Sequence, residues 1–231
     1  MSLNVAAAHT IGRMLMALRE NSRVDTIYAT VRDRICLGIY KPGDVLHEAE
    51  LGQEFQVSRT PIRQVLQRLA YEKLATVRSG VGTIVGGPGE SDVEICIRVR
   101  SQILMIVADM NLTVGRPEDA DAFDALMFRG SRIRKQPQED RVWSLMRDLH
   151  AFCNQLIAMD LLQNDDEMLF YRAAPSIVAA IRRDPQRAVA MLEAELDELA
   201  PFVDRGDLSD FFRARAKTML SYRDLTLVPT G

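Results

Sequence analysis

Cysteine is scarce in this sequence, and its three occurrences are odd in number and widely spaced, at Cys36, Cys96 and Cys153. Each of them stands among apolar residues. Small secreted domains instead carry an even set of cysteines that forms a disulfide framework. We therefore expect three buried free thiols in a protein of the reducing cytoplasm.

Long apolar runs and the motifs of common catalytic sites are also missing. No run approaches the ~18 apolar residues of a membrane-spanning helix. The amphipathic segment over residues 6–20 is interrupted by His9 and Arg13, which argues against a secretory signal. No glycine-rich phosphate loop, Ser/His/Asp order or Cys/His metal set is visible. We expect neither a membrane protein nor an enzyme.

An excess of positive charge is absent too. The formal net charge is −3, which excludes a protein that holds nucleic acid by bulk charge. The charge balance of residues 51–87 is different, because this segment contains five basic residues and only two acidic ones. The basic residues are Arg59, Arg63, Arg68, Lys73 and Arg78, and the acidic ones are Glu54 and Glu72. A small basic patch on an acidic chain favours a specific, dimeric reader of DNA over a non-specific coat.

The stretch Leu46–Leu69 has the pattern of two helices joined by a tight turn around Gln56 and Val57. Ser58 is placed to cap the second helix through its hydroxyl. Pro61 falls in the first turn, where a missing N–H costs little. The apolar stripe of this helix consists of Ile62, Val65, Leu66 and Leu69. The side chains away from the stripe are Arg59, Thr60, Arg63, Gln64 and Gln67. An amphipathic surface helix has the same stripe, but the polar front and the preceding short helix favour a helix-turn-helix that enters a DNA major groove.

Elements on both sides complete a larger motif. Residues 24–39 predict a helix that ends at a breaker cluster around Pro42 and Gly43. Its apolar stripe consists of Ile27, Val31 and Ile35. Downstream, β-type runs over residues 74–78 and 83–85 surround a glycine-containing turn and predict a hairpin. The order helix, helix, helix, hairpin is that of a winged helix-turn-helix.

These motifs resemble the DNA-binding domain of the GntR family of bacterial transcription regulators. The resemblance rests on Arg34–Leu46, Val57–Arg63 and Leu66–Leu69, and it covers roughly residues 24–87. It implies DNA contacts from the second helix of the motif and from the tip of the wing. The implied contact residues are Ser58, Arg59, Thr60, Arg63, Gln64 and Gly80. Some members carry another arginine early in the first helix of the motif, where this sequence has Ala49, so that contact is expected to be missing.

After Gly86–Gly89 the pattern is helical throughout, and we find no internal repeat. The expected helices cover residues 93–110, 117–133, 139–159, 165–182, 185–203 and 208–222. Pro175 predicts a kink or a break in the fourth of these, and Trp143 is expected in the core. The expected fold class is mainly α. The expected domains are an N-terminal extension (1–23), a winged helix-turn-helix domain (24–87), a linker (88–91) and an all-α domain (92–224).

This order resembles the FadR-like branch of the GntR family, whose helical FCD-type domain binds a small-molecule effector and contributes to a homodimer. Glu94–Met110, Leu149–His150 and Ile177–Asp184 carry the resemblance. It implies a carboxylate effector paired with Arg100. The alternative for Arg100 is an ion pair at the surface or between the domains. The further effector-binding candidates are His150, Asn154, Arg172 and Glu195.

Many members of that branch hold a divalent metal with an Asp four residues before a His and with two later His. Here Met146 precedes His150 by four residues, and Ala174 and Glu195 occupy the later positions. The other histidines, His9 and His47, lie in the N-terminal half, so one subunit cannot supply a three-histidine site. We expect no metal and no other cofactor, and a pocket-lining or hydrogen-bonded His150.

The sequence thus predicts a cytoplasmic, homodimeric transcription regulator, a repressor controlled by a small organic acid. Each subunit would place one helix in a half-site of a palindromic double-stranded DNA operator. One alternative is an architectural DNA binder without an effector, against which the large helical half argues. The less favoured alternative is an enzyme that uses the helical pocket.

Overall fold

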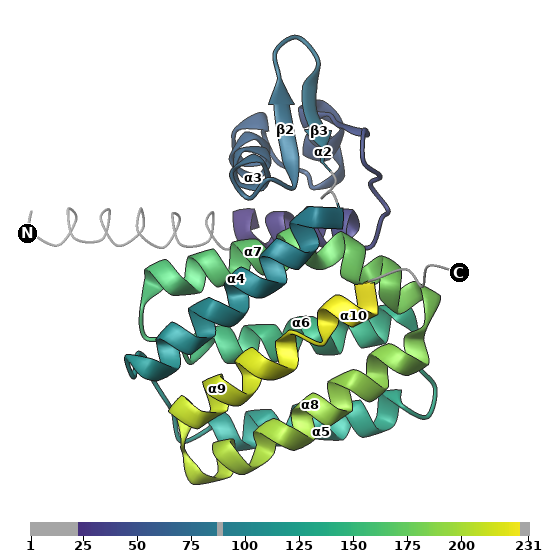
Figure 1. Cartoon of the computed structure of the whole chain (residues 1–231). Helices are drawn as coiled ribbons and strands as arrows, with labels where there is room; N and C mark the ends of the chain where they lie inside the picture. Colours follow the sequence, from purple (N-terminus) through teal and green to yellow (C-terminus); the bar gives the residue numbers. More distant parts are fainter. Residues whose placement is uncertain (1–22, 87–89, 227–231) are drawn as a thin grey trace, which may run out of the picture. The chain divides into compact units, whose positions relative to one another are not determined.

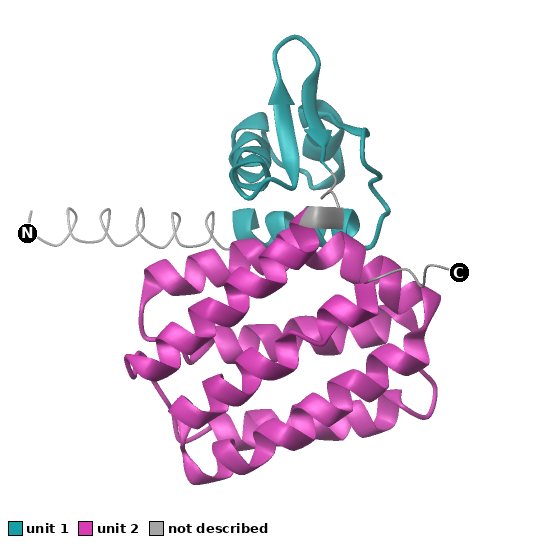
Figure 2. Cartoon of the chain, in the orientation of Figure 1, with its two compact units in different colours: residues 1–87 teal, residues 88–231 magenta. Residues whose placement is uncertain are grey.

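The computed structural model describes residues 23–86 and 90–226. The extension expected over residues 1–23 therefore lies outside the described residues except for Arg23, and so do positions 88 and 89 of the expected linker. The chain divides into two compact units, residues 1–87 and residues 88–231 (Figure 2).

Unit 1 has the helices and the antiparallel sheet of a winged helix-turn-helix (Figure 1). A helix over residues 23–36 precedes β1 (Val45–Leu46), α2 (Glu48–Glu54) and α3 (Arg59–Tyr71). The wing follows as β2 (Ala75–Arg78) and β3 (Gly82–Val85). The sheet order is β1-β3-β2, with Thr76 opposite Ile84 in the wing. The hairpin prediction is confirmed, whereas β1 was not predicted because two residues are too few to show an alternating pattern.

The predicted apolar stripes form the core of unit 1. The side chains of Ile62, Val65, Leu66 and Leu69 on α3 are buried, and so are Ile27, Val31 and Ile35 on the helix over residues 23–36. At the turn between α2 and α3, a Cβ on Gly52 would lie 3.2 Å from the carbonyl oxygen of Val57, so this close approach favours glycine. Ser58 is the N-cap residue of α3, but its side chain makes no cap hydrogen bond, so this detail of the prediction is wrong.

Unit 2 consists of helices (Figure 1). They are α4 (Glu90–Asp109), α5 (Asp119–Ile133), α6 (Glu139–Gln155), α7 (Asp160–Arg183), α8 (Pro185–Arg205), α9 (Leu208–Met219) and α10 (Tyr222–Thr226). Helix α4 packs against α7 and α9, and α5 packs against α6 and α8. Trp143 lies in the core with 2% of its surface exposed, and the thiols of Cys36, Cys96 and Cys153 are free and buried, as predicted.

Helix α7 differs most from its prediction. It runs from Asp160 to Arg183 with Pro175 inside it, so the expectation of a break is wrong. Proline removes one backbone hydrogen bond, but the buried residues Ala174, Ile177 and Val178 on both sides keep the segment packed. Tertiary packing therefore outweighs the local preference. The last predicted helix, over residues 208–222, ends earlier, at Met219 as α9, and the short helix α10 begins at Tyr222.

The caps around α8 agree with the sequence. The carboxylate of Asp184 accepts a hydrogen bond of 2.9 Å from the backbone N–H of Arg187, and Pro185 is the first helical residue. Gly206 ends the helix with φ +66°. No helix in the described part of the chain is both long and apolar enough to span a membrane.

Candidate functional site

The outer face of α3 carries the polar side chains that the sequence assigns to DNA. Its apolar stripe is buried in unit 1, so Ser58, Arg59, Thr60, Arg63 and Gln64 are exposed together on the opposite side. These side chains occupy the N-cap and the first turns of the helix, the part of a recognition helix that contacts base edges. The structure thus brings five of the six predicted DNA-binding residues onto one helix face.

The sixth residue, Gly80, is exposed in the turn between β2 and β3. Its φ is +75°, a left-handed conformation that side chains with a Cβ rarely adopt. Glycine therefore fits this tight turn, and its small size leaves the backbone of the wing tip accessible. Arg78 is exposed just before the turn.

Arg63 forms an ion pair with an acidic residue of the neighbouring helix. Its Nε donates to Oε1 of Glu48 at 3.1 Å, and its Nη2 donates to Oε2 at 3.0 Å. The hydrogen bonds from Arg63 hold the pKa of the Glu48 carboxyl below its usual value. The sequence did not assign Glu48 to this surface, because an acid in the first turn of a helix is an ordinary surface residue.

The side chain of Arg68 is 42% exposed, but it also contacts the helix over residues 23–36. Its Cζ lies 3.7 Å from the ring centroid of Tyr28, and its Nη1 donates to Asp25 at 3.2 Å. The Tyr28 hydroxyl donates to Glu72, and burial raises the pKa of that hydroxyl. Arg68 therefore joins the end of α3 to the helix over residues 23–36.

Unit 2 contains a second polar region, in its interior. Arg100 on α4 holds Asp166 on α7 through Nε–Oδ1 and Nη2–Oδ2 distances of 2.8 and 3.3 Å. The same Nη2 lies 3.1 Å from Nδ1 of His150 on α6. At most 4% of each of these residues is exposed. Arg100 thus lies in an ion pair, but in the interior of the helical unit rather than at a surface.

Aromatic rings support this ion pair. The His150 ring stacks on Phe170 with centroids 3.9 Å apart, and Phe170 stacks on Trp143 at 5.5 Å. The guanidinium carbon of Arg100 lies 5.0 Å from the Phe170 ring centroid. The same Nδ1 of His150 lies 3.4 Å from Oδ2 of Asp166, so the imidazole faces both members of the ion pair.

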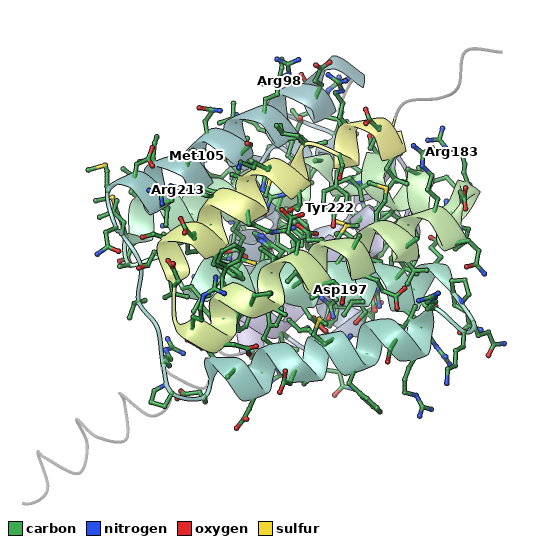
Figure 3. The ribbon with its side chains drawn as sticks, turned by 60° about the horizontal axis from the view of Figure 1, so that its bottom comes forward. Arg98, Met105, Arg183, Asp197, Arg213 and Tyr222 are labelled. Atoms are coloured by element: carbon green, nitrogen blue, oxygen red, sulfur yellow. The ribbon has the colours of Figure 1, made fainter. Side chains whose placement is uncertain are left out.

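A second buried ion pair lies in the same unit. Glu195 on α8 pairs with Arg215 on α9 and accepts hydrogen bonds from Thr218 at 2.7 Å and from the Tyr222 hydroxyl. Figure 3 shows Tyr222 toward the middle of the unit, whereas Arg98, Arg183 and Arg213 lie toward its periphery. Burial raises the pKa of the Tyr222 hydroxyl, and Arg215 partly offsets this effect.

Cys153 lies close to both ion pairs. Burial raises the pKa of its thiol, and the charges of Arg215, Asp166 and Arg100 all act on it. We call the combined set the buried polar cluster. Its members are Arg100, His150, Cys153, Asp166, Glu195, Arg215 and Tyr222. The two arginines balance the two carboxylates, yet Nε of Arg215 is buried without a hydrogen-bond partner among the described residues.

The structure does not bring all five predicted effector-binding residues together. Arg100, His150 and Glu195 belong to the buried polar cluster. Asn154 instead exchanges hydrogen bonds with Gln163, donating to its carbonyl at 2.9 Å. Arg172 is partly exposed and pairs with Asp92 at 3.1 Å.

Sequence reasoning missed Asp166 and Arg215. Asp166 stands in the acidic run Asp165–Glu167, which resembles a solvated helix face. A signal was nevertheless present, because Asp166, Phe170, Ala173 and Ile177 repeat at helical spacing, and all four are buried. Arg215 likewise lies midway between buried Phe211 and Met219.

The residues present do not fit the divalent metal of the FadR-like branch. Met146 and Ala174 offer neither a carboxylate nor an imidazole at two of the positions. The carboxylate of Glu195 is bound by Arg215, Thr218 and Tyr222. Within residues 23–86 and 90–226, no group of three or more His, Cys, Asp or Glu is arranged to hold a metal ion.

Comparison with known proteins identifies the first unit. Residues 23–85 match the family described as "Bacterial regulatory proteins, gntR family". The N-terminal unit of this protein is similar to that family over these residues. The match includes α3 and the wing, so the exposed face of α3 lies within the matched region.

Relatives of known sequence are named as regulators rather than enzymes. An uncharacterized HTH-type transcriptional regulator of Mycobacterium tuberculosis is 33% identical over 126 residues, which is 47% of this chain and 52% of that protein. The gluconate operon transcriptional repressor of Bacillus licheniformis is 40% identical over 63 residues, 27% of this chain and 26% of the repressor. The Uxu operon regulator of Haemophilus influenzae is 28% identical over 153 residues, 61% of this chain and 56% of that regulator. The chain thus spans about half, or less, of the length of these relatives.

Solved structures extend the likeness to both units. McbR/YncC of E. coli has a TM-score of 0.66 at 19% identity, over 85% of this chain and 93% of the other. A structure described as a putative transcriptional regulator GntR from Rhodococcus sp. RHA1 has a TM-score of 0.60 at 17% identity, over 89% and 97% of the two chains. At these identities the likeness concerns the fold.

Proposed function

We propose that this protein is a sequence-specific DNA-binding transcription regulator of the FadR-like type, a repressor whose helical unit binds a small organic acid. The observation that carries the proposal is the exposed polar face of α3 in a GntR domain. Arg59, Thr60, Arg63 and Gln64 are all side chains that donate hydrogen bonds to base edges or phosphates. The match to a repressor, over 63 residues, supports repression as the mode of action.

The operator is a palindromic double-stranded DNA read by a homodimer. The net charge of −3 favours few, specific contacts over non-specific coating. Two copies related by a two-fold axis would place one α3 in each half-site, about one DNA turn apart. The buried thiols fit a location in the reducing cytoplasm.

The effector is a small carboxylate that binds at the buried polar cluster. Burying two ion pairs is costly, and well-packed apolar residues of similar volume are often as stable or more stable. The retention of Arg100 and Arg215 in the interior therefore supports a role beyond stability. An organic acid would compete with Asp166 for the guanidinium of Arg100, so its binding would rearrange the contacts between α4, α6 and α7.

The DNA proposal is tested by fluorescence-anisotropy titration with DNA from upstream of the protein's own gene. The titration is run at two salt concentrations with excess random competitor. We expect tight, competitor-resistant binding, and about tenfold or greater loss in Arg59→Ala. The control Arg132→Ala removes the same charge from an exposed position on α5 and leaves the affinity unchanged. Absence of binding to any DNA at low salt contradicts the proposal, and binding without sequence preference supports the architectural alternative.

The effector proposal is tested by thermal unfolding of the whole protein with a panel of hydroxy, keto and dicarboxylic acids. A ligand at a hundred times its Kd stabilises the folded state by about 2.7 kcal/mol, which raises Tm by several degrees. We expect this rise in the wild type and in Arg172→Lys, because Arg172 lies outside the cluster. Arg100→Lys keeps the positive charge but cannot bind a carboxylate through two parallel hydrogen bonds, so the ligand-induced rise in Tm should be smaller. An equal rise in both variants contradicts the assignment to Arg100.

A further inference from the structure

Helix α5 carries an exposed face on which the sign of the charge changes along the helix. Phe128, with 63% of its surface exposed, lies at the middle of this face. Asp121 and Asp124 precede it, Arg132 follows it, and Lys135 lies in the turn directly after α5; all four are exposed. In the described part of the chain, none of these four charged side chains forms an ion pair. The charges of this face are therefore left uncompensated by the helical unit itself.

The spacing of this face is symmetric about Phe128. Asp121 and Lys135 are each seven residues away from it, and Asp124 and Arg132 are each four residues away. Residues four and seven positions apart lie on one side of a helix, so the five side chains share one face. Matching positions carry opposite charges. Such a face is complementary to itself after a two-fold rotation that reverses the helix direction, which is what a symmetric contact between two copies requires.

Small residues leave room around Phe128. Ala125 and Ser131, three residues before and after it, are both exposed. On one side the ring borders a groove of about 460 Å³ between α5 and α6, whose lining includes Ile133 and Arg132. The guanidinium carbon of Arg132 lies 5.9 Å from the centroid of the Phe128 ring. A second aromatic ring therefore has room to pack against Phe128 and to contact this guanidinium.

We propose that α5 packs antiparallel against α5 of a second copy of this chain, with the two Phe128 rings in contact at the two-fold axis. Steps of about 100° per residue place Arg132 and Asp121 on one side of Phe128, and Lys135 and Asp124 on the other. In the antiparallel pair, Arg132 of each copy therefore lies opposite Asp121 of the other, offset by about 4.5 Å along the helix. Lys135 lies opposite Asp124 in the same way. A parallel pair would instead bring like charges together.

This contact is weak, which determines what it joins. One helix face with a single large apolar side chain belongs to the class of transient interfaces, below about 1,200 Å² of buried surface. Exposed ion pairs add only a little to its strength. We therefore assign it to association between dimers rather than to the homodimer that reads a palindrome. Dimers on neighbouring operators are held at a high local concentration, so a weak contact is enough to make their binding cooperative. This consequence rests on the proposed function, whereas the contact itself does not.

Sedimentation equilibrium of the whole protein tests the contact without DNA. The average mass should rise above that of the species present at low concentration as the protein approaches roughly 0.5 mM. Phe128→Asp places two carboxylates at the axis, and we expect it to raise the dissociation constant of this association at least roughly tenfold. Leu161→Asp is the matched control, because Leu161 is 64% exposed on α7 and lies outside the face. A mass that does not rise in the wild type, or that rises equally in Phe128→Asp, overturns the proposal.

Charge reversal tests the antiparallel arrangement. Asp121→Arg brings arginines opposite each other, and Arg132→Asp brings aspartates opposite each other, so each variant alone should associate about tenfold more weakly. An equal mixture of the two variants should recover the wild-type association, because every arginine then lies opposite an aspartate of the other variant. Asp165→Arg makes the same charge change at an exposed position on α7 and should associate like the wild type. A mixture that associates no better than either variant alone overturns the antiparallel arrangement.

DNA with one or two operators separates failure of this contact from failure of the proposed function. Phe128→Asp should bind a single operator as tightly as the wild type, because α3 is unchanged, and should lose the cooperative filling of two operators on one DNA. Self-association with the predicted recovery in the mixture, but without DNA binding, would confirm the contact and reject the regulator. Equal cooperativity in the wild type and in Phe128→Asp would reject a role of the contact on DNA.

Discussion

Arg63 of α3 is held by Glu48 of the preceding helix, α2, through two parallel hydrogen bonds of 3.1 and 3.0 Å. A guanidinium has five N–H donors, so three remain available while the pair is formed. Glu48 therefore fixes the direction of Arg63 and places a negative charge beside the exposed face of α3, which we propose contacts DNA.

We expect Glu48→Gln to raise affinity for random DNA, because it removes that negative charge and frees Arg63 to reach any phosphate. Operator affinity should rise less, so the ratio of specific to non-specific affinity falls. The measurement is an anisotropy titration with operator and random DNA over a range of salt. Glu50→Gln makes the same charge change from an exposed position on α2. Equal effects in both variants would mean that only net charge matters.

Removal of Asp166 should destabilise the helical unit strongly. Asp166→Ala leaves the guanidinium of Arg100 buried without its carboxylate, and breaking a buried pair costs about 3–5 kcal/mol. Urea unfolding followed by circular dichroism measures the change. Glu139→Ala breaks the more exposed pair with Arg182 and should cost about 1 kcal/mol or less. A similar small cost in both variants would show that the interior of unit 2 is hydrated.

The stability of the helical unit should decrease at alkaline pH. Burial raises the pKa of the Cys153 thiol and of the Tyr222 hydroxyl, so both groups bind protons more tightly in the folded protein. Their contribution is fully present below the unfolded pKa values of about 8.5 and 10, and it is lost as pH rises above them. Denaturant unfolding from neutral pH to about pH 10.5 measures this loss. In Cys153→Ala, the free energy of unfolding should fall less steeply over the lower part of this pH range, where the thiol titrates. An unchanged dependence on pH would exclude the thiol as a contributor.

The three thiols should be inert in the native protein. Each is buried, and burial raises the pKa of Cys96 and Cys153, which lowers the fraction of reactive thiolate. A colorimetric thiol assay should detect little reaction before denaturation and three thiols afterwards. If one thiol reacted rapidly in the native protein, the segment that buries it would have to open to solvent.

The helix-turn-helix could be predicted because its signals are local. The stripe on α3, the turn before Ser58 and the glycine turn of the wing all lie within a few residues of the structure they specify. The strand β1 is too short for a pattern, and Pro175 is tolerated because packing from distant residues holds α7. The partnership of Arg100 with Asp166 spans 66 residues of sequence. Helical spacing could have placed Asp166 in the interior, but only the packing of α4 against α7 makes it the partner of Arg100.

Val99 and Arg100 are consecutive residues of α4 that point about 100° apart around its axis, and Val99 is 42% exposed whereas Arg100 is 4% exposed. A helix is nearly rigid over such a distance, because each backbone N–H is bonded four residues back along the chain. A tilt or slide of α4 that begins at Arg100 therefore displaces Val99 by almost the same amount, without any relay through other side chains. Any displacement of the buried polar cluster is thus carried directly to the exposed side of α4, and this helix begins at Glu90, only five residues after the wing ends at Val85.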